Sequence, residues 1–154
     1  MQVARFTANF TESSRKEFSP KINASSGQGK TVLLIDDEKL VINISELMLK
    51  ELGYKVLKAH NGFEGLQLFE AHKTGIDLII SDLEMPKMNG NEVLKKLRKI
   101  DPEIRVLLSS GSLTAADEQS IIDRGFNGFL QKPYTLNALC GKISEILYGS
   151  IQLH

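Results

Sequence analysis

The sequence contains one cysteine and no excess of either charge, and both shortages exclude classes of protein. Cys140 stands alone, which rules out an internal disulfide and a cysteine-rich zinc site. Lysine plus arginine total 19, and aspartate plus glutamate also total 19. No broad positive field therefore argues for nucleic acid or an anionic membrane as partner. We read Cys140 as a small apolar helix residue in a protein from a reducing compartment.

Long hydrophobic runs are also missing. The apolar stretches are far shorter than a membrane span, and no early segment combines a basic start, an apolar run and a small-residue cleavage site. We therefore expect a cytoplasmic protein without a membrane segment. Its 154 residues, 42% apolar and 25% charged, suit one core and hence one domain with a tail.

The first 29 residues differ in composition from the rest. They are rich in serine, asparagine, threonine and lysine, which is typical of a tail or linker. Only residues 3–10 (VARFTANF) alternate apolar and polar positions as a short strand does, and they resemble a remnant of an upstream domain. We expect a tail over 1–29, one domain over 30–148 and a C-terminal tail over 149–154.

From residue 30 onward, an apolar β-rich run followed by a segment of helical period recurs five times. The expected strands are 31–35, 54–59, 76–81, 104–109 and 127–131. The expected helices are 38–52, 62–72, 90–99, 114–124 and 135–148. Right-handed crossovers between five such units predict an α/β fold, a doubly wound flavodoxin-like (βα)5 sandwich with a parallel sheet of order 2-1-3-4-5.

Local patterns refine this prediction. The first, third and fourth strands are apolar on both faces and should be central, whereas lysines in the second indicate an edge strand. Gly53, Asn61, Thr114 and Gly125 are typical of helix ends. The first helix has an apolar stripe that we expect to pack on the sheet, formed by Leu40, Ile44, Leu47, Met48 and Leu52.

Charged side chains follow three of the expected strands. Asp36 and Asp37 come after the first, Asp82 after the third and Lys132 after the fifth. The carboxyl ends of parallel strands share one edge of the sheet, so these groups should converge there. Crowded carboxylates suit a magnesium ion, and Lys132 can neutralise a phosphate oxygen. Asp82 is then a candidate nucleophile toward phosphorus, and Ser110, at the end of the fourth strand, a candidate donor to the phosphoryl group.

Residues 30–148 closely resemble the receiver domain of two-component response regulators. The matching motifs, in order, are IDDE with Asp36 and Asp37, DLEMPKMNG from Asp82, LLSSG with Ser110 and QKP with Lys132. The resemblance implies that Asp82 accepts a phosphoryl group from a phosphohistidine. It also implies a magnesium or manganese ion bound by Asp37, Asp82 and the backbone carbonyl of Glu84, with Asp36 acting mostly through a water.

The same resemblance assigns roles around the phosphoryl group. Ser110 and Lys132 would contact it after transfer, and Phe129 would be the aromatic residue whose rotamer accompanies the switch. Glu84 and Ser112 would tune the lifetime of the phosphorylated form. Pro133 is expected to follow a cis peptide bond. The face that changes is formed by the fourth helix, fifth strand and fifth helix, and it includes Asp117, Ile121, Phe129, Asn137 and Lys142.

Partners follow from the resemblance as well. It implies a sensor histidine kinase or a histidine phosphotransfer protein as phosphodonor, and a downstream protein as effector. Few residues follow Tyr148, so we expect no DNA-binding domain. The amino-acid sequence is most similar to the C-terminal receiver of a hybrid histidine kinase. We expect no enzymatic activity beyond the domain's own phosphorylation and dephosphorylation, and the resemblance also implies a homodimer that depends on phosphorylation.

Other readings of the same residues remain open. A phosphorylation-independent binding module with a receiver-like fold is one alternative. A haloacid dehalogenase-type phosphatase is another, although this chain has Glu84 two residues after Asp82, where that class needs an aspartate. The segment GQGKT resembles a nucleotide-binding loop but lacks its first glycine and precedes a strand. A flavodoxin needs a phosphate-binding loop after the first strand, and here that loop is acidic.

Overall fold

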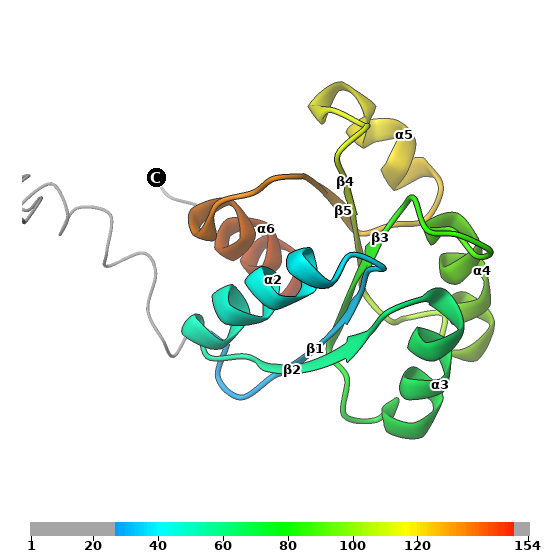
Figure 1. The fold of residues 1–154 in the computed structure, drawn as a ribbon, viewed down its shortest axis with the longest axis horizontal. Helices are drawn as coiled ribbons and strands as arrows, with labels where there is room; N and C mark the ends of the chain where they lie inside the picture. Colours follow the sequence, from blue (N-terminus) through cyan, green and yellow to red (C-terminus); the bar gives the residue numbers. More distant parts are fainter. Residues whose placement is uncertain (1–26, 150–154) are drawn as a thin grey trace, which may run out of the picture.

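Five parallel strands form one sheet in the computed structural model, which describes residues 27–149. The order β2-β1-β3-β4-β5 confirms the predicted doubly wound fold, with helices on both faces (Figure 1). Residues 3–10, expected to form a strand, lie outside the described residues. Among residues 27–149 no helix is both long and apolar enough to cross a membrane.

The boundaries of the elements agree closely with those expected. The strands are β1 (Thr31–Ile35), β2 (Lys55–Ala59), β3 (Leu78–Asp82), β4 (Val106–Ser110) and β5 (Gly128–Gln131). The helices are α2 (Lys39–Glu51), α3 (Gly62–His72), α4 (Gly90–Ile100), η2 (Ala115–Asp117), α5 (Glu118–Asp123) and α6 (Leu136–Tyr148). Strands β3 and β4 begin two residues later than predicted, and β3 ends on Asp82 itself.

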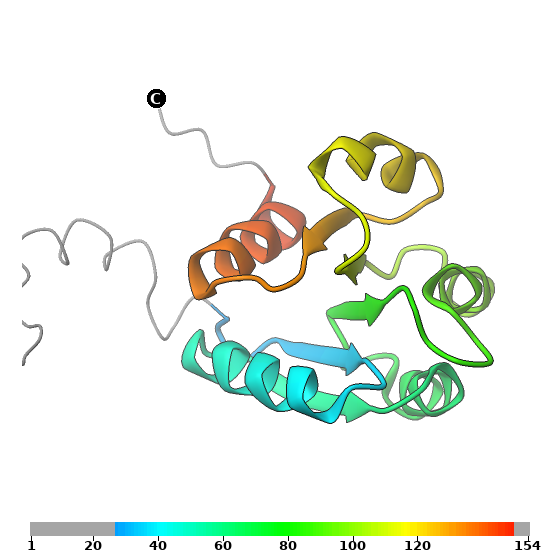
Figure 2. The same ribbon diagram turned by 45° about the horizontal axis from the view of Figure 1, so that its top comes forward.

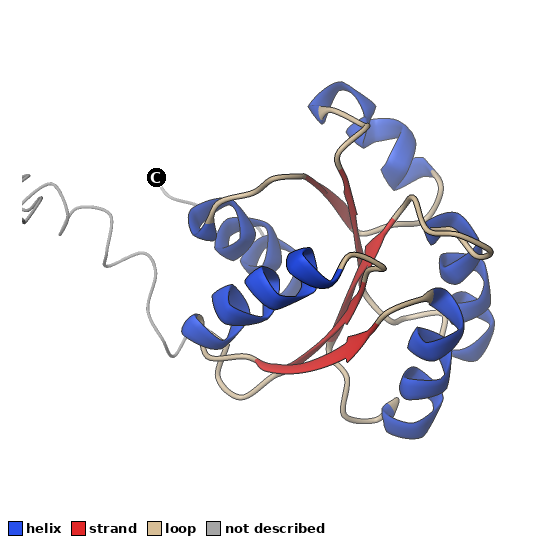
Figure 3. Ribbon diagram, in the orientation of Figure 1, coloured by secondary structure: helices blue, strands red, loops and turns tan. Residues whose placement is uncertain are grey.

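The sheet is covered on both faces, which explains the continuous apolar runs. Every residue of β3 and β4 is buried, while β2 at the edge is partly exposed at its two lysines, as predicted. Side chains of α2 and α6 pack with Leu34 and Leu107 on one face, and those of α3, α4 and α5 with Ile35 and Leu108 on the other. Figures 2 and 3 show the helices arranged on the two sides of the sheet. Consecutive strand residues therefore face different helices.

Helix ends follow the predicted signals. The side chain of Asn61 accepts a hydrogen bond from the backbone N–H of Glu64, and Thr114 accepts one from Ala116. Gly53 and Gly125 have positive φ angles of 91° and 111°, which glycine adopts without strain. The segment predicted as one helix over 114–124 is instead a 3-10 turn, η2, followed by the six-residue α5.

The apolar stripe on α2 was assigned to the wrong face. Leu40, Ile44 and Leu47 are 72%, 46% and 70% exposed, although Leu52 is buried and Met48 packs against the core as expected. The helix instead turns a second stripe toward the sheet, formed by Ile42, Ser45 and Leu49. Ser45 interrupts that second stripe, so the count of apolar residues favoured the face that lies in solvent.

Candidate functional site

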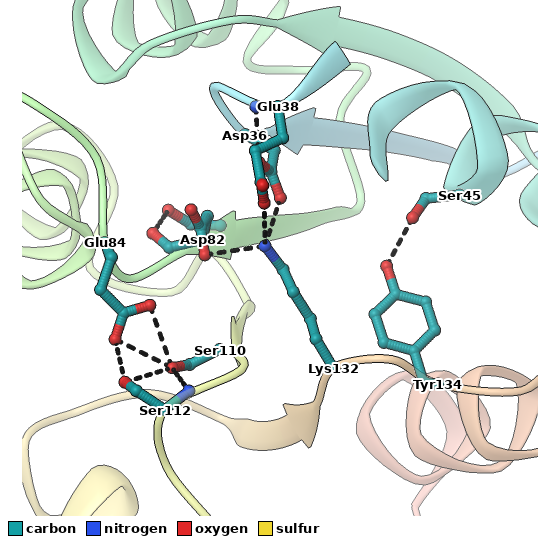
Figure 4. A network of polar contacts seen from close by, with 10 residues as sticks. Asp36, Glu38, Ser45, Asp82, Glu84, Ser110, Ser112, Lys132 and Tyr134 are labelled. Carbon is teal, nitrogen blue, oxygen red and sulfur yellow. Dashed lines mark hydrogen bonds and ion pairs between the residues drawn. The ribbon is translucent and has the colours of Figure 1, made fainter. Parts of the chain in front are cut away.

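Strand ends bring the predicted charged residues together at one edge of the sheet. Asp36 follows β1, Asp82 is the last residue of β3, and Lys132 follows β5. The side chains of Asp36, Asp82 and Lys132 converge, as the sequence predicted (Figure 4). Asp36 and Asp82 are only 6% and 3% exposed, so two carboxylates lie within the protein rather than on its surface.

The ammonium group of Lys132 lies between the carboxylates. Its Nζ is 2.8 Å from Asp36 Oδ2, 3.0 Å from Asp82 Oδ1 and 3.5 Å from Glu38 Oε1. The other oxygen of the Asp36 carboxylate, Oδ1, accepts a hydrogen bond of 2.9 Å from the backbone N–H of Glu38. Buried carboxylates are stable only when paired or hydrogen-bonded, and Lys132 meets that need here.

Protonation of the site reflects this crowding. Burial and then the neighbouring Asp36 charge raise the pKa of the Asp82 carboxyl to about 6, although Lys132 opposes the shift. For Lys132, burial acts to lower the pKa, but hydrogen bonds and charges of Asp36 and Asp82 outweigh it and raise the pKa above its usual value. At neutral pH Lys132 is therefore charged and most of Asp82 is ionised.

Three carboxylates have the arrangement of a cation site. One oxygen each from Asp36, Asp37 and Asp82 lie within 4.8 Å of one another, and Asp37 is exposed at the outer side. Hard oxygen ligands of this kind are those that magnesium prefers. The donor set thus fits a magnesium ion, and the exposed Asp37 gives such an ion access from solvent.

A second polar cluster adjoins Asp82 on the side away from Lys132. Ser110 Oγ donates to both carboxylate oxygens of Glu84, at 3.1 and 3.0 Å, and lies 3.1 Å from Ser112 Oγ. Ser112 also donates to Glu84 through its hydroxyl (Figure 4). Ser110, the predicted hydrogen-bond donor to a phosphoryl group, is thus fully buried and held by the predicted tuning residues Glu84 and Ser112.

A glycine keeps the end of β3 close to helix α4. A Cβ at Gly90 would lie 2.6 Å from the carbonyl oxygen of Asp82 and 3.0 Å from the Leu83 Cα. The Gly90 N–H in turn donates to the carbonyl of Leu83 at 2.9 Å. Asn89 begins the helix with a reciprocal cap to Glu92. The motif after Asp82 therefore serves close packing of α4 against the end of β3.

The residues expected on the switching face are only partly on the surface. Phe129 is 4% exposed and Ile121 is fully buried, both within the cluster beneath α5. The alternation along β5 turns Phe129 inward toward α5. Lys142 does lie there and forms an ion pair of 3.0 Å with Glu118. The predicted cis peptide between Lys132 and Pro133 is present.

Several residues near the site had not been singled out in the sequence. Ser45, Ser109 and Tyr134 line a cavity of about 10 Å³ beneath Asp36 and Asp82. Ser109 could have been found from strand alternation, because it shares a sheet face with Leu107 and Asp82. Ser45 and Tyr134 carried no such signal, since their contact joins positions 89 residues apart.

Comparison with known proteins identifies the family. The model of the response regulator receiver domain matches residues 32–144. The chain is 32% identical over 127 residues to the autoinducer 1 sensor kinase/phosphatase LuxN of Vibrio campbellii, and 35% identical over 117 residues to the sensor kinase CckA of Brucella abortus. These matches cover 82% and 76% of this chain, but 14% and 12% of those proteins.

Solved structures support the same relationship. A receiver domain protein from Clostridium thermocellum superposes with a TM-score of 0.71 at 30% identity, covering 77% of this chain and 94% of that one. The chemotaxis protein CheY4 of Vibrio cholerae gives 0.70 at 28% identity, covering 77% and 99%. With its flavodoxin-like sheet and acidic strand-end pocket, the chain belongs to the family of response regulator receiver domains of two-component systems.

Proposed function

We propose that Asp82 is the phosphoacceptor of a two-component phosphorelay. One observation carries the proposal: a buried carboxylate at the end of β3 lies 3.0 Å from a lysine ammonium and within 4.8 Å of two further carboxylates. Because the negative groups outnumber the one cation, the site attracts a divalent cation, and that ion together with Lys132 would offset the charge of an incoming phosphoryl group. Membership of the receiver family supports the same role.

The reaction would be a transfer from nitrogen to oxygen. An oxygen of the ionised Asp82 attacks the phosphorus of a phosphohistidine, the O–P bond forms, and the P–N bond breaks with its electron pair passing to the imidazole. Although the Asp82 pKa is raised to about 6, the reactive carboxylate still predominates at neutral pH. Hydrolysis of the acyl phosphate later restores the carboxylate, so the domain needs no other enzymatic activity.

A magnesium ion, or manganese in its place, would be held by Asp36, Asp37, Asp82 and the backbone carbonyl of Glu84. When bound it supplies positive charge that offsets the negative charge of the phosphoryl group. Lys132 would balance a further phosphoryl oxygen, since its ammonium is already oriented toward Asp82. The carboxylates therefore select the cation, and Lys132 orients the group that is transferred.

Ser110 would couple phosphorylation of Asp82 to a conformational change. Its hydroxyl donates to Glu84 in this structure, and donation to a phosphoryl oxygen instead would require that contact to break. Phe129, packed under α5, is the aromatic residue that would move with it. We infer that phosphorylation shifts the population of conformations of the α5, β5 and α6 face, which an effector protein or a second copy of the domain reads.

The phosphodonor would be a sensor histidine kinase or a histidine phosphotransfer protein acting in the cytoplasm. LuxN and CckA are themselves named sensor kinases, which supports a receiver that is part of a hybrid kinase. Helix α2 begins beside Asp36 and exposes Leu40, Ile44 and Leu47. An apolar strip next to the pocket suits a donor protein whose histidine must reach Asp82.

Phosphorylation by acetyl phosphate tests the proposal directly. With magnesium we expect intact mass to rise by one phosphoryl group in the wild type and in the control Asp123→Ala, and no rise in Asp82→Ala. EDTA should abolish the gain. A wild type that gains nothing, with a folded circular dichroism spectrum, would instead favour the phosphorylation-independent binding module.

A further inference from the structure

We propose that Tyr134 and Ser45 act as a pair of positioning residues, whose mutual hydrogen bond holds the loop that carries Lys132 against helix α2. The inference rests on the proposed phosphoacceptor role of Asp82. It adds two residues that neither touch the phosphoryl group nor bind the cation. Their role would be to hold the Lys132 ammonium in its position between the carboxylates of Asp36 and Asp82.

The pair joins two distant elements at one atom-to-atom contact. Tyr134 Oη lies 2.6 Å from Ser45 Oγ, and this bond links the loop between β5 and α6 to the middle of α2 (Figure 4). Tyr134 is only two residues after Lys132, whose backbone N–H is bonded to the Ser110 carbonyl at 2.9 Å. The loop is thus fixed on one side by β4 and on the other by α2.

A cavity beneath the acidic cluster explains why the hydrogen bond between Tyr134 and Ser45 would matter. The cavity of about 10 Å³ is bounded by Asp36 and Asp82 above and by Ser45, Ser109 and Tyr134 around it. A cavity of that size has about the volume of one water molecule, so side chains at its wall have room to shift. The bond from Tyr134 to Ser45 connects two of its walls and restrains that movement.

The chemistry of the pair suits a neutral, directional contact. Burial raises the pKa of the Tyr134 hydroxyl, although the hydrogen bond with Ser45 opposes the shift. The tyrosine therefore keeps its proton and always has one to donate. Ser45 is 3% exposed, so its hydroxyl has little access to water and depends on this partner. Removing the Tyr134 hydroxyl leaves that of Ser45 buried without its partner.

A positioning role predicts a specific kinetic effect. Neither residue reaches the small phosphodonor, so its half-saturating concentration should not change. The maximal phosphorylation rate should fall, because Lys132 would sample orientations that do not face Asp82. Loss of one neutral hydrogen bond predicts a fall of about fivefold. A purely structural role would instead lower stability and leave the maximal rate of the folded fraction unchanged.

The experiment compares Tyr134→Phe, Ser45→Ala and the double variant with the wild type, using acetyl phosphate and magnesium. Tyr54→Phe is the matched control, because Tyr54 is another tyrosine that packs in the same cluster but lies away from the site. We expect each single variant to lose about fivefold in maximal rate, and the double variant to lose no more than either single one. Ser45→Thr should restore the rate.

Hydrogen exchange gives a readout that needs no phosphorylation. The Lys132 amide should exchange about fivefold faster in Tyr134→Phe than in Tyr54→Phe. The inference is overturned if both the maximal rate and this exchange match the control, or if the losses of the two single variants multiply. If the wild type is not phosphorylated but the Lys132 amide still exchanges faster in Tyr134→Phe than in Tyr54→Phe, the proposed function is contradicted and the positioning link is supported.

Discussion

The hydroxyl of Ser110 donates to the carboxylate of Glu84, its oxygen lying 3.1 and 3.0 Å from the two carboxylate oxygens. One residue belongs to the end of β4 and the other to the loop after Asp82. The same hydroxyl is the proposed donor to the phosphoryl group, so the Glu84 carboxylate and that group compete for one proton. The acidic residue also places a negative charge close to where an anionic phosphodonor must arrive.

Replacing Glu84 with glutamine should therefore speed phosphorylation. Glu84→Gln keeps the shape of the side chain and its backbone carbonyl but removes the charge, and we expect the rate with acetyl phosphate to rise by roughly threefold at low salt. The gain should shrink as ionic strength increases. Glu103→Gln, an exposed change away from the site, should have no effect. A slower reaction in Glu84→Gln would show that the carboxylate assists rather than competes.

Magnesium should stabilise the folded protein through the carboxylates. A ligand that binds only the native state raises its stability by mass action, and each kcal/mol should raise Tm by roughly 4 °C in a domain of this size. We expect Tm of the wild type and of Asp123→Asn to increase with added magnesium, and that of Asp37→Asn to stay constant. Thermal denaturation with and without EDTA measures this. An equal increase in all three proteins would place the ion elsewhere.

Asp82 should make the wild type less stable as pH rises. Its pKa is about 6 in the folded state against 3.8 for an ordinary carboxyl, so between these values the native state binds more protons than the unfolded one. Stability from this group is full below pH 4 and is lost as pH rises through 6.

Asp82→Asn cannot titrate and should escape that loss. Without magnesium we expect it to be more stable than the wild type by roughly 3 kcal/mol at pH 7.5, with no advantage below pH 4. Urea unfolding at a series of pH values measures the difference. A constant difference at every pH would mean that the effect comes from packing rather than from the Asp82 proton.

Helix α2 offers a direct test of its corrected face. Leu40→Gln and Leu47→Gln change side chains that lie mostly in solvent, so the free energy of unfolding should change by less than about 0.5 kcal/mol. Leu49→Ala opens a cavity at a fully buried position and should cost about 2–5 kcal/mol. Chemical denaturation distinguishes the two. A large loss from the exposed leucines would restore the original assignment.

The sequence predicted the secondary structure and its buried faces correctly where the apolar residues followed only one periodic pattern. Buried strands such as β3 are continuous apolar runs, and their ends place Asp36, Asp82 and Lys132 at one edge by topology alone. It failed on α2, because two overlapping stripes share the helical period and only the packed structure chooses between them. The buried face contains Ser45, whose partner Tyr134 lies far away in sequence.

The residues of the candidate site likewise include some that the sequence could predict and some that it could not. The charged residues could be predicted because their chemistry is visible in the residue type. The contact of Glu84 with Ser110 and the cavity beneath Asp82 depend on side-chain direction, which no sequence pattern states. For Phe129 the sequence predicted its place on the fifth strand, but only the structure shows that its side chain is buried under α5.

Strand β4 ends in two consecutive serines whose side chains leave opposite faces of the sheet. Ser109 borders the cavity below Asp82, and Ser110 meets Glu84 on the side of α5. A backbone shift that draws Ser110 toward a phosphoryl group must also move Ser109, because one peptide unit connects them. On the proposed mechanism the cavity would give Ser109 room to move with Ser110, so a bulkier residue at position 109 should hinder the conformational change without preventing phosphorylation of Asp82.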